Sequence, residues 1–295
     1  MNFTKAITGK NGYYPIKTMI QFKKDTEKII AMALAEDLGT GDITTLSVLP
    51  ENTVSRAVFR AKQEGVICGL FLVEQVFTYL DPSVSFTQLC NEGETVSAGQ
   101  DIAVVEGNAR AILSGERVAL NFLQHLSGIA TQTSNWVNTI KGTGVKIVDT
   151  RKTTPGLRVL EKYAVRTGGG FNHRMNLSDG VLIKDNHIKA AGGIKQAIKA
   201  ARSYAPQTLK IEVETESLEQ VKEALDAGAD IIMLDNMSLK DMNAAVKMIK
   251  GKAIIEASGN MNQKNLQAVA QTGVDLISMG ALTNNVKSLD VSLKF

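Results

Sequence analysis

A block rich in basic residues, from Lys146 to Lys189, is the part of the sequence best suited to chemistry on anions. It holds nine basic and four acidic side chains, an excess of five positive charges, whereas the whole chain has a net charge of +3. The basic residues are separated by Thr, Gly and Asn and by short apolar runs, which is not the texture of a solvated helix face. We therefore expect a pocket that binds the phosphate or carboxylate groups of a small molecule.

Two acidic side chains farther along the chain, Glu214 and Asp235, could supply oxygen ligands to a magnesium ion. Mg²⁺ keeps several waters and takes other ligands from substrate phosphates, so basic residues and this ion together fit a pyrophosphate substrate. Lys184 leaves a second chemistry open, because a lysine at the end of a strand could form a Schiff base, as in barrel aldolases. No Ser–His–acid or Cys–His arrangement stands out.

Alternating strands and helices from residue 145 onward must position these side chains. Short β-branched runs alternate with amphipathic segments, which is typical of a parallel sheet covered by helices. Polar or charged residues follow each predicted strand, at the ends where parallel α/β folds place their active sites. The six predicted strands cover residues 145–151, 180–187, 209–216, 229–236, 252–260 and 274–282.

The repeat length favours a ring of similar strand–helix units. Glu214 and Asp235 are 21 residues apart, Asp235 and Glu256 are also 21 apart, and Met279 follows after 23. Six strands are fewer than the eight of a complete barrel. We therefore predict an α/β fold with an incomplete α/β barrel, and a doubly wound sheet is the alternative.

The first half of the chain predicts a separate α+β domain with a sandwich-like arrangement of strands. An amphipathic helix over 22–37 precedes short strands and turns in 54–107. The turn pattern of 91–109 resembles the hairpins of biotinyl and lipoyl carrier domains. A carrier needs a lysine at the hairpin tip, and no lysine occurs between Lys62 and Lys141, which argues against a carrier function.

A long helical pattern over 115–140 follows these strands. Arg117 lies in its first turn, and an arginine at a helix N-terminus is well placed to hold a carboxylate. The tail, residues 289–295, alternates between apolar and polar residues and predicts a half-buried strand. The predicted boundaries are therefore 1–128 for the N-terminal domain, 129–285 for the barrel, and 286–295 for a strand that returns to the first domain.

The overall composition indicates a globular protein without metal or disulfide staples. The chain has 295 residues, of which 44% are hydrophobic and 21% charged, enough to bury a sizeable core. Its cysteines, Cys68 and Cys90, lie in no CxxC or Cys/His cluster. No apolar run reaches transmembrane length, and a net charge of +3 does not suggest binding to nucleic acid or to a membrane. We expect a cytoplasmic protein.

Eight segments of the sequence are characteristic of one enzyme family. They are AEDLGTGDITT (35–45), GERVALNFLQHLSGIAT (115–131), DTRKTTPGLR (149–158), KYAVRTGGGFNHRMNLSDGVLIKDNH (162–187), EVET (212–215), LDN (234–236), EASGN (256–260) and GVDLISMGALT (273–283). Together they closely resemble quinolinate phosphoribosyltransferases, also known as nicotinate-nucleotide pyrophosphorylases (carboxylating). The match covers nearly all of residues 25–295.

This resemblance implies a fold and a reaction. Members of the family convert quinolinate and phosphoribosyl pyrophosphate to nicotinate mononucleotide, pyrophosphate and CO₂, with Mg²⁺ as the cofactor. They pair a sandwich-like N-terminal domain with an incomplete barrel, in agreement with the fold predicted from the residues. Quinolinate is a dianion and its co-substrate carries several negative charges, which explains the need for a cationic block.

The family's quinolinate contacts correspond to four positions of this sequence. Arg117 resembles the arginine that reaches the quinolinate site from the neighbouring subunit of a homodimer. Arg151, His173 and Arg174 resemble the contacts to the quinolinate carboxylates.

The contacts to the phosphoribosyl substrate correspond to a second set. Lys152 and Lys184 resemble the phosphate and pyrophosphate contacts, with Lys184 near both substrates. Glu214 and Asp235 resemble the pair that holds Mg²⁺ and the ribose, and these four residues are the predicted catalytic set. The expected contacts to the 5′-phosphate are Ser258, Gly259 and Gly280.

Three other functions remain as alternatives. The first is a related pyrophosphorylase acting on another planar acid, although His173 followed by Arg174 favours a dicarboxylate. The second is a barrel aldolase or isomerase that uses Lys184. The third is a sugar-phosphate-binding or scaffold protein, which would bind without turnover.

Overall fold

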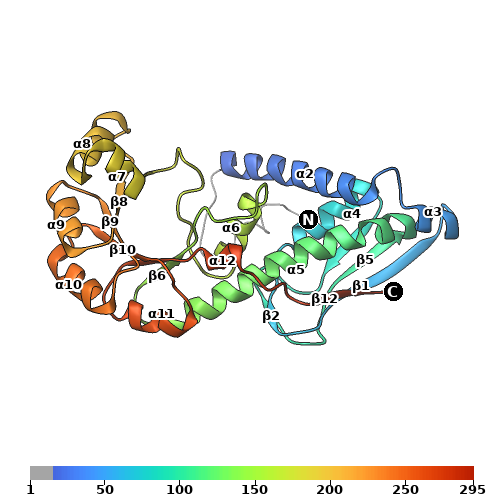
Figure 1. Ribbon diagram of the computed structural model, residues 1–295. Coiled ribbons are helices and arrows are strands. Elements are labelled where there is room, and N and C mark those ends of the chain that lie inside the picture. Colours follow the sequence, from blue (N-terminus) through green and yellow to red (C-terminus); the bar gives the residue numbers. More distant parts are fainter. Residues whose placement is uncertain (1–15) are drawn as a thin grey trace. The chain divides into compact units, whose positions relative to one another are not determined.

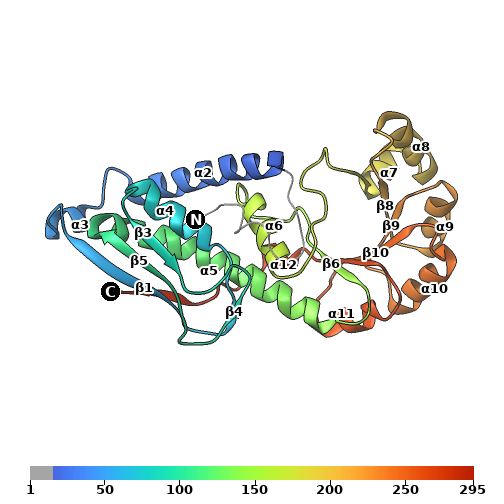
Figure 2. The same ribbon diagram turned by 180° about the vertical axis from the view of Figure 1, so that it is seen from behind.

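The computed structural model describes residues 16–295, with the side chains of 22–262 and 265–295. The chain divides into two compact units, which we name unit 1 and unit 2 (Figure 1, Figure 2). Unit 1 comprises the described part of Met1–Ser134 together with Thr154–Gly169 and Val286–Phe295. Unit 2 comprises Asn135–Thr153 and Gly170–Asn285.

Unit 1 is built on a four-stranded antiparallel sheet with the strand order β12-β1-β5-β3. The C-terminal strand β12 pairs with β1, so the end of the chain completes this sheet. A separate two-stranded sheet pairs β2 with β4. The strands of unit 1 are β1 (Val54–Ala61), β2 (Gly65–Val66), β3 (Ser85–Gln88), β4 (Thr95–Val96), β5 (Asp101–Asn108) and β12 (Val291–Lys294).

Helices of unit 1 cover one face of the four-stranded sheet. In β1 the side chains of Ala57, Phe59 and Ala61 are buried and alternate with more exposed ones, as expected for a strand with one face in the core. Phe59 packs against Phe77 of α4, with ring centroids 6.1 Å apart. Both α4 (Leu70–Leu80) and α5 (Ala109–Thr139) lie on this side of the sheet (Figure 1).

Three helices of unit 1 meet through aromatic side chains. Phe22 of α2 (Ile16–Leu38), Phe71 of α4 and Tyr163 of α6 (Arg158–Thr167) have ring centroids between 5.3 and 5.7 Å apart. The short helix α3 (Ile43–Val48) begins at Asp42, whose carboxylate accepts a hydrogen bond from the backbone N–H of Thr45.

Because α6 packs in this way, residues 154–169 belong to unit 1. The observed division therefore differs from a single boundary at residue 128, and the first part of unit 1 extends to Ser134, within α5. Aromatic packing between segments far apart in the chain leaves no local signal, which is why the sequence analysis includes these residues in the barrel range 129–285.

Unit 2 contains a six-stranded parallel sheet with the order β6-β11-β10-β9-β8-β7. The strands from β7 to β11 follow one another across the sheet in chain order, and β6 joins beyond β11. A doubly wound sheet would reverse its direction near the middle, so this order is that of a ring. The strands are β6 (Lys146–Val148), β7 (Val181–Ile183), β8 (Ile211–Thr215), β9 (Ile231–Asp235), β10 (Ile254–Ser258) and β11 (Leu276–Ser278).

The ring of unit 2 is open between β6 and β7, which are not paired with each other among the described residues. The prediction of an incomplete barrel is thus confirmed, and all six predicted strands are present. Phe171 forms a single parallel bridge with Val148 of β6, and the chain then runs on toward β7.

Helices separate the strands of unit 2 and flank its sheet (Figure 2). Ser217 and Ser238 begin two of them, and each side chain accepts a hydrogen bond from a backbone N–H of the first turn. The helices are α7 (Asp185–Ala191), α8 (Ile194–Tyr204), α9 (Leu218–Asp226), α10 (Leu239–Ile249), α11 (Gln263–Ala270) and α12 (Ala281–Asn284).

Cys68 and Cys90 are both buried, and neither forms a disulfide bond. Among the helices of the described residues, none combines the length and the apolar character that a membrane crossing requires.

Candidate active site

Charged and polar side chains that could take part in chemistry gather at the C-terminal ends of the strands of unit 2. Lys184 follows β7, Glu214 lies near the end of β8, and Asp235 ends β9. Ser258 ends β10 and Gly280 follows β11. We name these strand ends, with Arg151 and Lys152 after β6, the strand-end rim. All the predicted site residues of unit 2 lie on this rim or on the segment between Phe171 and β7.

Lys184 and Glu214 form an ion pair across neighbouring strands. The Nζ atom of Lys184 lies 2.5 Å from Oε2 of Glu214. The lysine side chain is 46% exposed and the glutamate side chain 11% exposed, so the ammonium group can be reached from solvent. The backbone N–H of Lys184 donates to Nδ1 of His187, which fixes the first turn of α7.

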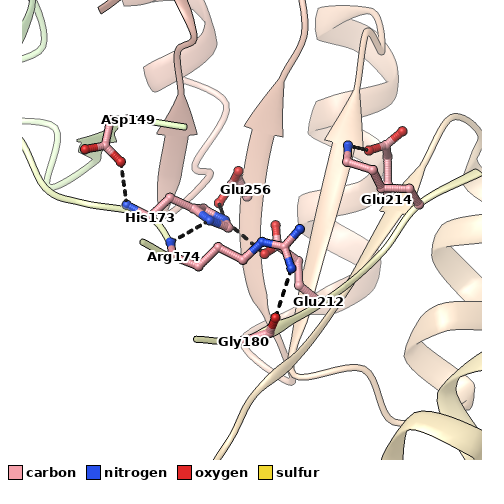
Figure 3. A network of polar contacts seen from close by, with 8 residues as sticks. Asp149, His173, Arg174, Gly180, Glu212, Glu214 and Glu256 are labelled. Atoms are coloured by element: carbon pink, nitrogen blue, oxygen red, sulfur yellow. Dashed lines mark hydrogen bonds and ion pairs between the residues drawn. The ribbon is translucent and has the colours of Figure 1, made fainter. Parts of the chain in front are cut away.

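The segment that carries His173 and Arg174 is anchored to the end of β6. Asp149 is fully buried, and its carboxylate accepts hydrogen bonds from the backbone N–H of His173 and the side-chain amide of Asn172. Carboxylates buried in this way need such donors to replace water. The anchor brings His173 across the opening of the ring to the side chain of Glu212 in β8 (Figure 3).

His173 is held by two buried glutamates on neighbouring parts of the sheet. Its Nε2 atom is 3.0 Å from Oε2 of Glu212 and 3.6 Å from Oε2 of Glu256. The ligand atoms of these three residues all lie within 4.8 Å of one another. Burial, and after it the charge of Glu212, raises the pKa of Glu256 to about 7.

The guanidinium group of Arg174 lies close to other charges of the site. Its Nη1 atom donates to the backbone oxygen of Gly180 at 3.0 Å (Figure 3). Burial, and after it the positive charge of Arg151, lowers the pKa of Arg174, whereas Glu212 raises it. An arginine keeps its proton under these conditions, so Arg151 and Arg174 form a cationic pair suited to carboxylates.

Lys152 and Gly280 meet where β6 and β11 end side by side. A Cβ atom on Gly280 would lie 2.7 Å from Cδ of Lys152, so the absence of a side chain lets the lysine stem pass. The backbone oxygen of Lys152 also accepts a hydrogen bond of 2.6 Å from Oγ1 of Thr283. These contacts join two predicted phosphate-binding elements.

Asn236 joins the end of β9 to the loop after β10. Its Nδ2 atom donates to Oδ2 of Asp235 at 3.0 Å, and its Oδ1 atom accepts from the backbone N–H of Asn260 at 3.1 Å. Asn236 has a φ of 52° and Gly259 a φ of 118°, both in the left-handed region. A Cβ atom on Gly259 would collide with the Asn236 side chain, so glycine is required there.

The carboxylates of Glu214 and Asp235 stand on the neighbouring strands β8 and β9 and fit the needs of a magnesium ion. Hard carboxylate oxygens are the ligands that Mg²⁺ prefers, and two of them suffice when substrate and water supply the rest. Lys184 adds a cation beside Glu214, at the same strand ends.

Glu212 and Glu256 are site residues that the sequence analysis missed. Glu256 marks only the repeat length there. A usable signal exists, because each glutamate stands between two apolar residues of its strand, Ile211 and Val213 in β8 and Ile255 and Ala257 in β10, and an acid at such a position needs a partner. That partner, His173, is distant in sequence and could not be identified from the pattern.

Arg117, the remaining predicted site residue, belongs to unit 1. It lies on α5 and is exposed to solvent. The prediction that Arg117 occupies the first turn of its helix is wrong, because α5 begins at Ala109 and Arg117 therefore lies in the helix interior, away from the N-terminal N–H groups. His125 on the same helix has a structural role, since its Nε2 atom lies 2.9 Å from Oε1 of Glu161 in α6.

Comparisons with known proteins point to one family. The models of the N-terminal and C-terminal domains of quinolinate phosphoribosyl transferase match residues 42–127 and 129–294. A protein of Bacillus subtilis, described as a probable nicotinate-nucleotide pyrophosphorylase (carboxylating), is 46% identical over 267 residues, which are 90% of this chain and 92% of the relative. A Synechocystis protein of the same description is 48% identical over 264 residues, or 88% of this chain and 89% of the relative.

A solved structure agrees with these relatives. The nicotinate-nucleotide pyrophosphorylase of Francisella tularensis superposes with a TM-score of 0.88 at 42% sequence identity. The superposition covers 92% of this chain and 96% of that one.

Proposed function

The chain belongs to the quinolinate phosphoribosyltransferase family, and from this premise we infer that it transfers the phosphoribosyl group of phosphoribosyl pyrophosphate to quinolinate. The products are nicotinate mononucleotide, pyrophosphate and CO₂, in a step of NAD biosynthesis. The observation that carries this function is the set of cationic side chains on the strand-end rim of a chain that matches both family domains.

The cationic side chains offset the repulsion between two anionic substrates. Bringing a dicarboxylate next to a pyrophosphate in a pocket of low dielectric costs several kcal/mol unless cations compensate. Arg151 and Arg174 serve the quinolinate carboxylates, and Lys152 and Lys184 serve the phosphate groups. This division follows the resemblance of these four positions to the family's quinolinate and phosphate contacts, with Lys184 near both substrates.

In the transfer step, the bond between C1 of the ribose and the pyrophosphate oxygen breaks. The electron pair of that bond leaves with pyrophosphate, and positive charge develops on the ribose ring. Lys152 and Lys184 stabilise the leaving group, because their ammonium charges are already in place as its negative charge grows. The pyridine nitrogen of quinolinate then supplies the electron pair for the new bond to C1.

Decarboxylation follows from the charge on the new pyridinium ring. The ring accepts the electron pair of the bond to the neighbouring carboxylate, which leaves as CO₂, and the ring carbon then takes up a proton. No organic cofactor is needed for this step. Ribosylation therefore precedes decarboxylation, and accumulation of nicotinate without ribosylation would contradict this order.

Glu214 and Asp235 would hold the magnesium ion and the ribose hydroxyl groups. A bound Mg²⁺ supplies charge stabilisation to a pyrophosphate. Ser258, Gly259 and Gly280 would bind the 5′-phosphate, Ser258 through its hydroxyl group and the two glycines through their backbone groups.

The active assembly we propose is a homodimer, in which Arg117 of one subunit completes the quinolinate site of the other. Two features of unit 1 support an interface: Arg117 is exposed, and α3 exposes the apolar side chains of Ile43, Leu46 and Val48. A folded protein rarely leaves several large apolar side chains exposed without a partner. We place this enzyme in the cytoplasm, with small-molecule substrates and no nucleic-acid or membrane partner.

Release of CO₂ from carboxyl-labelled quinolinate tests the function. We expect release that requires both phosphoribosyl pyrophosphate and Mg²⁺, with nicotinate mononucleotide formed in equal amount. Release that does not require phosphoribosyl pyrophosphate would refute the transfer reaction. A Lys184 adduct trapped by borohydride with a sugar phosphate would instead support the aldolase alternative, and binding without turnover would support a scaffold.

A further inference from the structure

Glu212 and Glu256 are two buried acids that the proposed reaction does not use. Their side chains are 4% and 0% exposed. A carboxylate in such a place loses its hydration, which is costly unless the protein supplies a partner. Oε1 of Glu212 and both carboxylate oxygens of Glu256 are buried without a hydrogen-bond partner among the described residues. A pair of acids with so few donors in the core of a sheet requires a specific reason.

The two acids share one contact, the imidazole ring of His173. Both carboxylates approach the same atom, Nε2 of His173, at 3.0 Å from Glu212 and 3.6 Å from Glu256 (Figure 3). On the other side of the ring, Nδ1 accepts a hydrogen bond of 2.9 Å from the backbone N–H of Arg174. Because Nδ1 is an acceptor, the ring proton sits on Nε2 and points at the two glutamates.

This arrangement changes the role of His173. With Nδ1 bound to the Arg174 backbone and Nε2 directed at the glutamates, the protein itself engages both ring nitrogens. In this conformation neither nitrogen points a hydrogen at a substrate carboxylate. The imidazole instead connects the two buried acids to the backbone of the next residue, Arg174.

Arg174 is the residue through which the arrangement reaches the substrate. Its guanidinium lies close enough to Arg151 for their charges to disfavour each other, and Glu212 offsets that repulsion. Gly180 holds the far end of the same side chain. The acids thus act twice on Arg174, through the His173 ring and through the charge of Glu212.

We propose that Glu212 and Glu256 are positioning residues, which hold the His173–Arg174 segment so that Arg174 stands beside Arg151 as a paired contact for the quinolinate carboxylates. This proposal rests on the proposed function and assigns His173 an indirect role. The proposal predicts different effects on the binding of the two substrates. The acids position the arginine pair, which contacts quinolinate, and they do not position Lys152, which contacts phosphate.

Substitution by the neutral isostere tests the proposal. In Glu212→Gln and Glu256→Gln we expect the KM for quinolinate to rise by about tenfold or more, because small misplacements of a binding group are expensive. The KM for phosphoribosyl pyrophosphate should change by less than about twofold. An equal change in both KM values, or no change in either, would refute the proposal.

Glu161→Gln is the matched control, because Glu161 is also a buried acid bonded to a histidine, at 2.9 Å, but in unit 1. Glu161→Gln should lower the melting temperature without raising the KM for quinolinate relative to the KM for phosphoribosyl pyrophosphate. If Glu256→Gln fails to fold, Glu212→Gln gives the decisive result, since Glu212 has the shorter contact to Nε2.

A second readout is independent of turnover. The chain has three histidines, so ¹⁵N-labelled imidazole signals can be assigned with a His173→Gln sample. We expect the Nε2–H form of His173 in the free protein, retained when quinolinate is added, and mixed forms in Glu212→Gln. An Nδ1–H form, or a change of form caused by quinolinate, would overturn the indirect role.

Two outcomes separate this proposal from others. If the wild-type protein neither binds nor converts quinolinate, the proposed function fails, whereas the tautomer of His173 can still be read. If the purified protein carries a stoichiometric metal ion that Glu256→Gln loses, the three residues are a metal site and the positioning role is wrong.

Discussion

Lys184 and Glu214 show how a contact can matter for chemistry and little for stability. Their charges are 2.5 Å apart, but the lysine side chain is 46% exposed. Exposed ion pairs contribute at most about 1 kcal/mol, because water screens the attraction and the long side chain loses freedom. The pair therefore positions the ammonium group, which we propose to contact a phosphate, without forming part of the core.

Lys184→Ala should separate these two properties. We expect kcat to fall by at least about a hundredfold, because a preorganised charge at the leaving group is lost. The free energy of unfolding should fall by less than about 1 kcal/mol. Steady-state kinetics and urea unfolding measure the two effects. A stability loss of several kcal/mol would show that the lysine is structural.

Gly280→Ala tests the close approach at Lys152. The backbone of Gly280 has φ −62° and ψ −31°, which alanine adopts without strain. The added methyl group would lie 2.7 Å from Cδ of Lys152, so the lysine must move. We expect a fall in kcat/KM for phosphoribosyl pyrophosphate of about tenfold or more with a nearly unchanged melting temperature. Unchanged kinetics would mean that the lysine position is not critical.

Among the secondary-structure elements, the N-terminus of α4 is capped by Glu92, a residue of a loop distant in sequence. Gly69 precedes α4 with a φ of 106° and has no side chain for capping. Glu92 supplies the missing cap, because its carboxylate accepts hydrogen bonds from the backbone N–H groups of Gly69 and Leu70. Burial, the largest effect, raises the pKa of Glu92 to about 7, and hydrogen bonds partly oppose it.

This half-buried acid gives unit 1 a pH-dependent stability. The pKa of Glu92 is higher in the folded chain than the ordinary 4.5, so the folded state binds more protons between pH 4.5 and 7. Stability therefore falls as the pH rises through this window, by roughly 3 kcal/mol. The raised pKa of Glu256 contributes with the same sign.

Glu92→Gln should remove about half of the pH dependence of the whole chain, since Glu92 in unit 1 and Glu256 in unit 2 both have a pKa raised to about 7 and contribute with the same sign. The measurement is the melting temperature at pH 5, 6, 7 and 8 for the wild type and the variant. An undiminished slope in Glu92→Gln would show that Glu92 is ionised throughout this range. Glu161→Gln, which neutralises a fully buried carboxylate of unit 1, is a suitable comparison.

Local sequence patterns predicted which strands unit 2 contains more accurately than the residues at which those strands end. The apolar runs located all six strands, because a parallel strand buried on both faces is apolar along its length. The run 180–187 predicts one strand, yet β7 covers only Val181–Ile183 and α7 begins at Asp185. The change to helix depends on the bond from Lys184 to His187, which the apolar pattern does not record.

The site was predicted in part for a similar reason. Residues at strand ends could be identified because the ring order brings successive ends to one rim. Glu212 and Glu256 were missed because their partner, His173, comes from a segment that crosses the ring opening. The placement of α6 in unit 1 depends likewise on long-range packing of Tyr163.

Across the chain as a whole, the charge is distributed unevenly. The block from Lys146 to Lys189 has an excess of five positive charges, and the rest of the chain is slightly acidic. The part of this block outside residues 154–169 belongs to unit 2, where its basic residues attract anions toward the strand-end rim without making the whole surface basic. In the proposed homodimer, Arg117 of the other subunit adds one more positive charge at the substrate site.

Mixed dimers test the shared site. Homodimers of Arg117→Ala and of Lys152→Ala should each be nearly inactive. When the two variants are mixed equally and exchange subunits, half the dimers are mixed, and each has one intact site of two. We expect about a quarter of the wild-type activity. No recovery after verified subunit exchange would refute the contribution of Arg117 across the interface.

The central proposal is that cationic side chains on one rim hold the two anionic reactants together, with Arg151 and Arg174 binding quinolinate and Lys152 binding the phosphate groups. Calorimetric binding of quinolinate and of inorganic pyrophosphate to the wild type and to Arg151→Gln/Arg174→Gln tests this division of roles without relying on turnover. We predict that quinolinate binding weakens by at least about a hundredfold, since each charge-assisted contact is worth about 1.5 to 3 kcal/mol. Pyrophosphate binding should change by less than about threefold. Unchanged quinolinate binding in the double variant would show that the arginine pair does not hold this substrate.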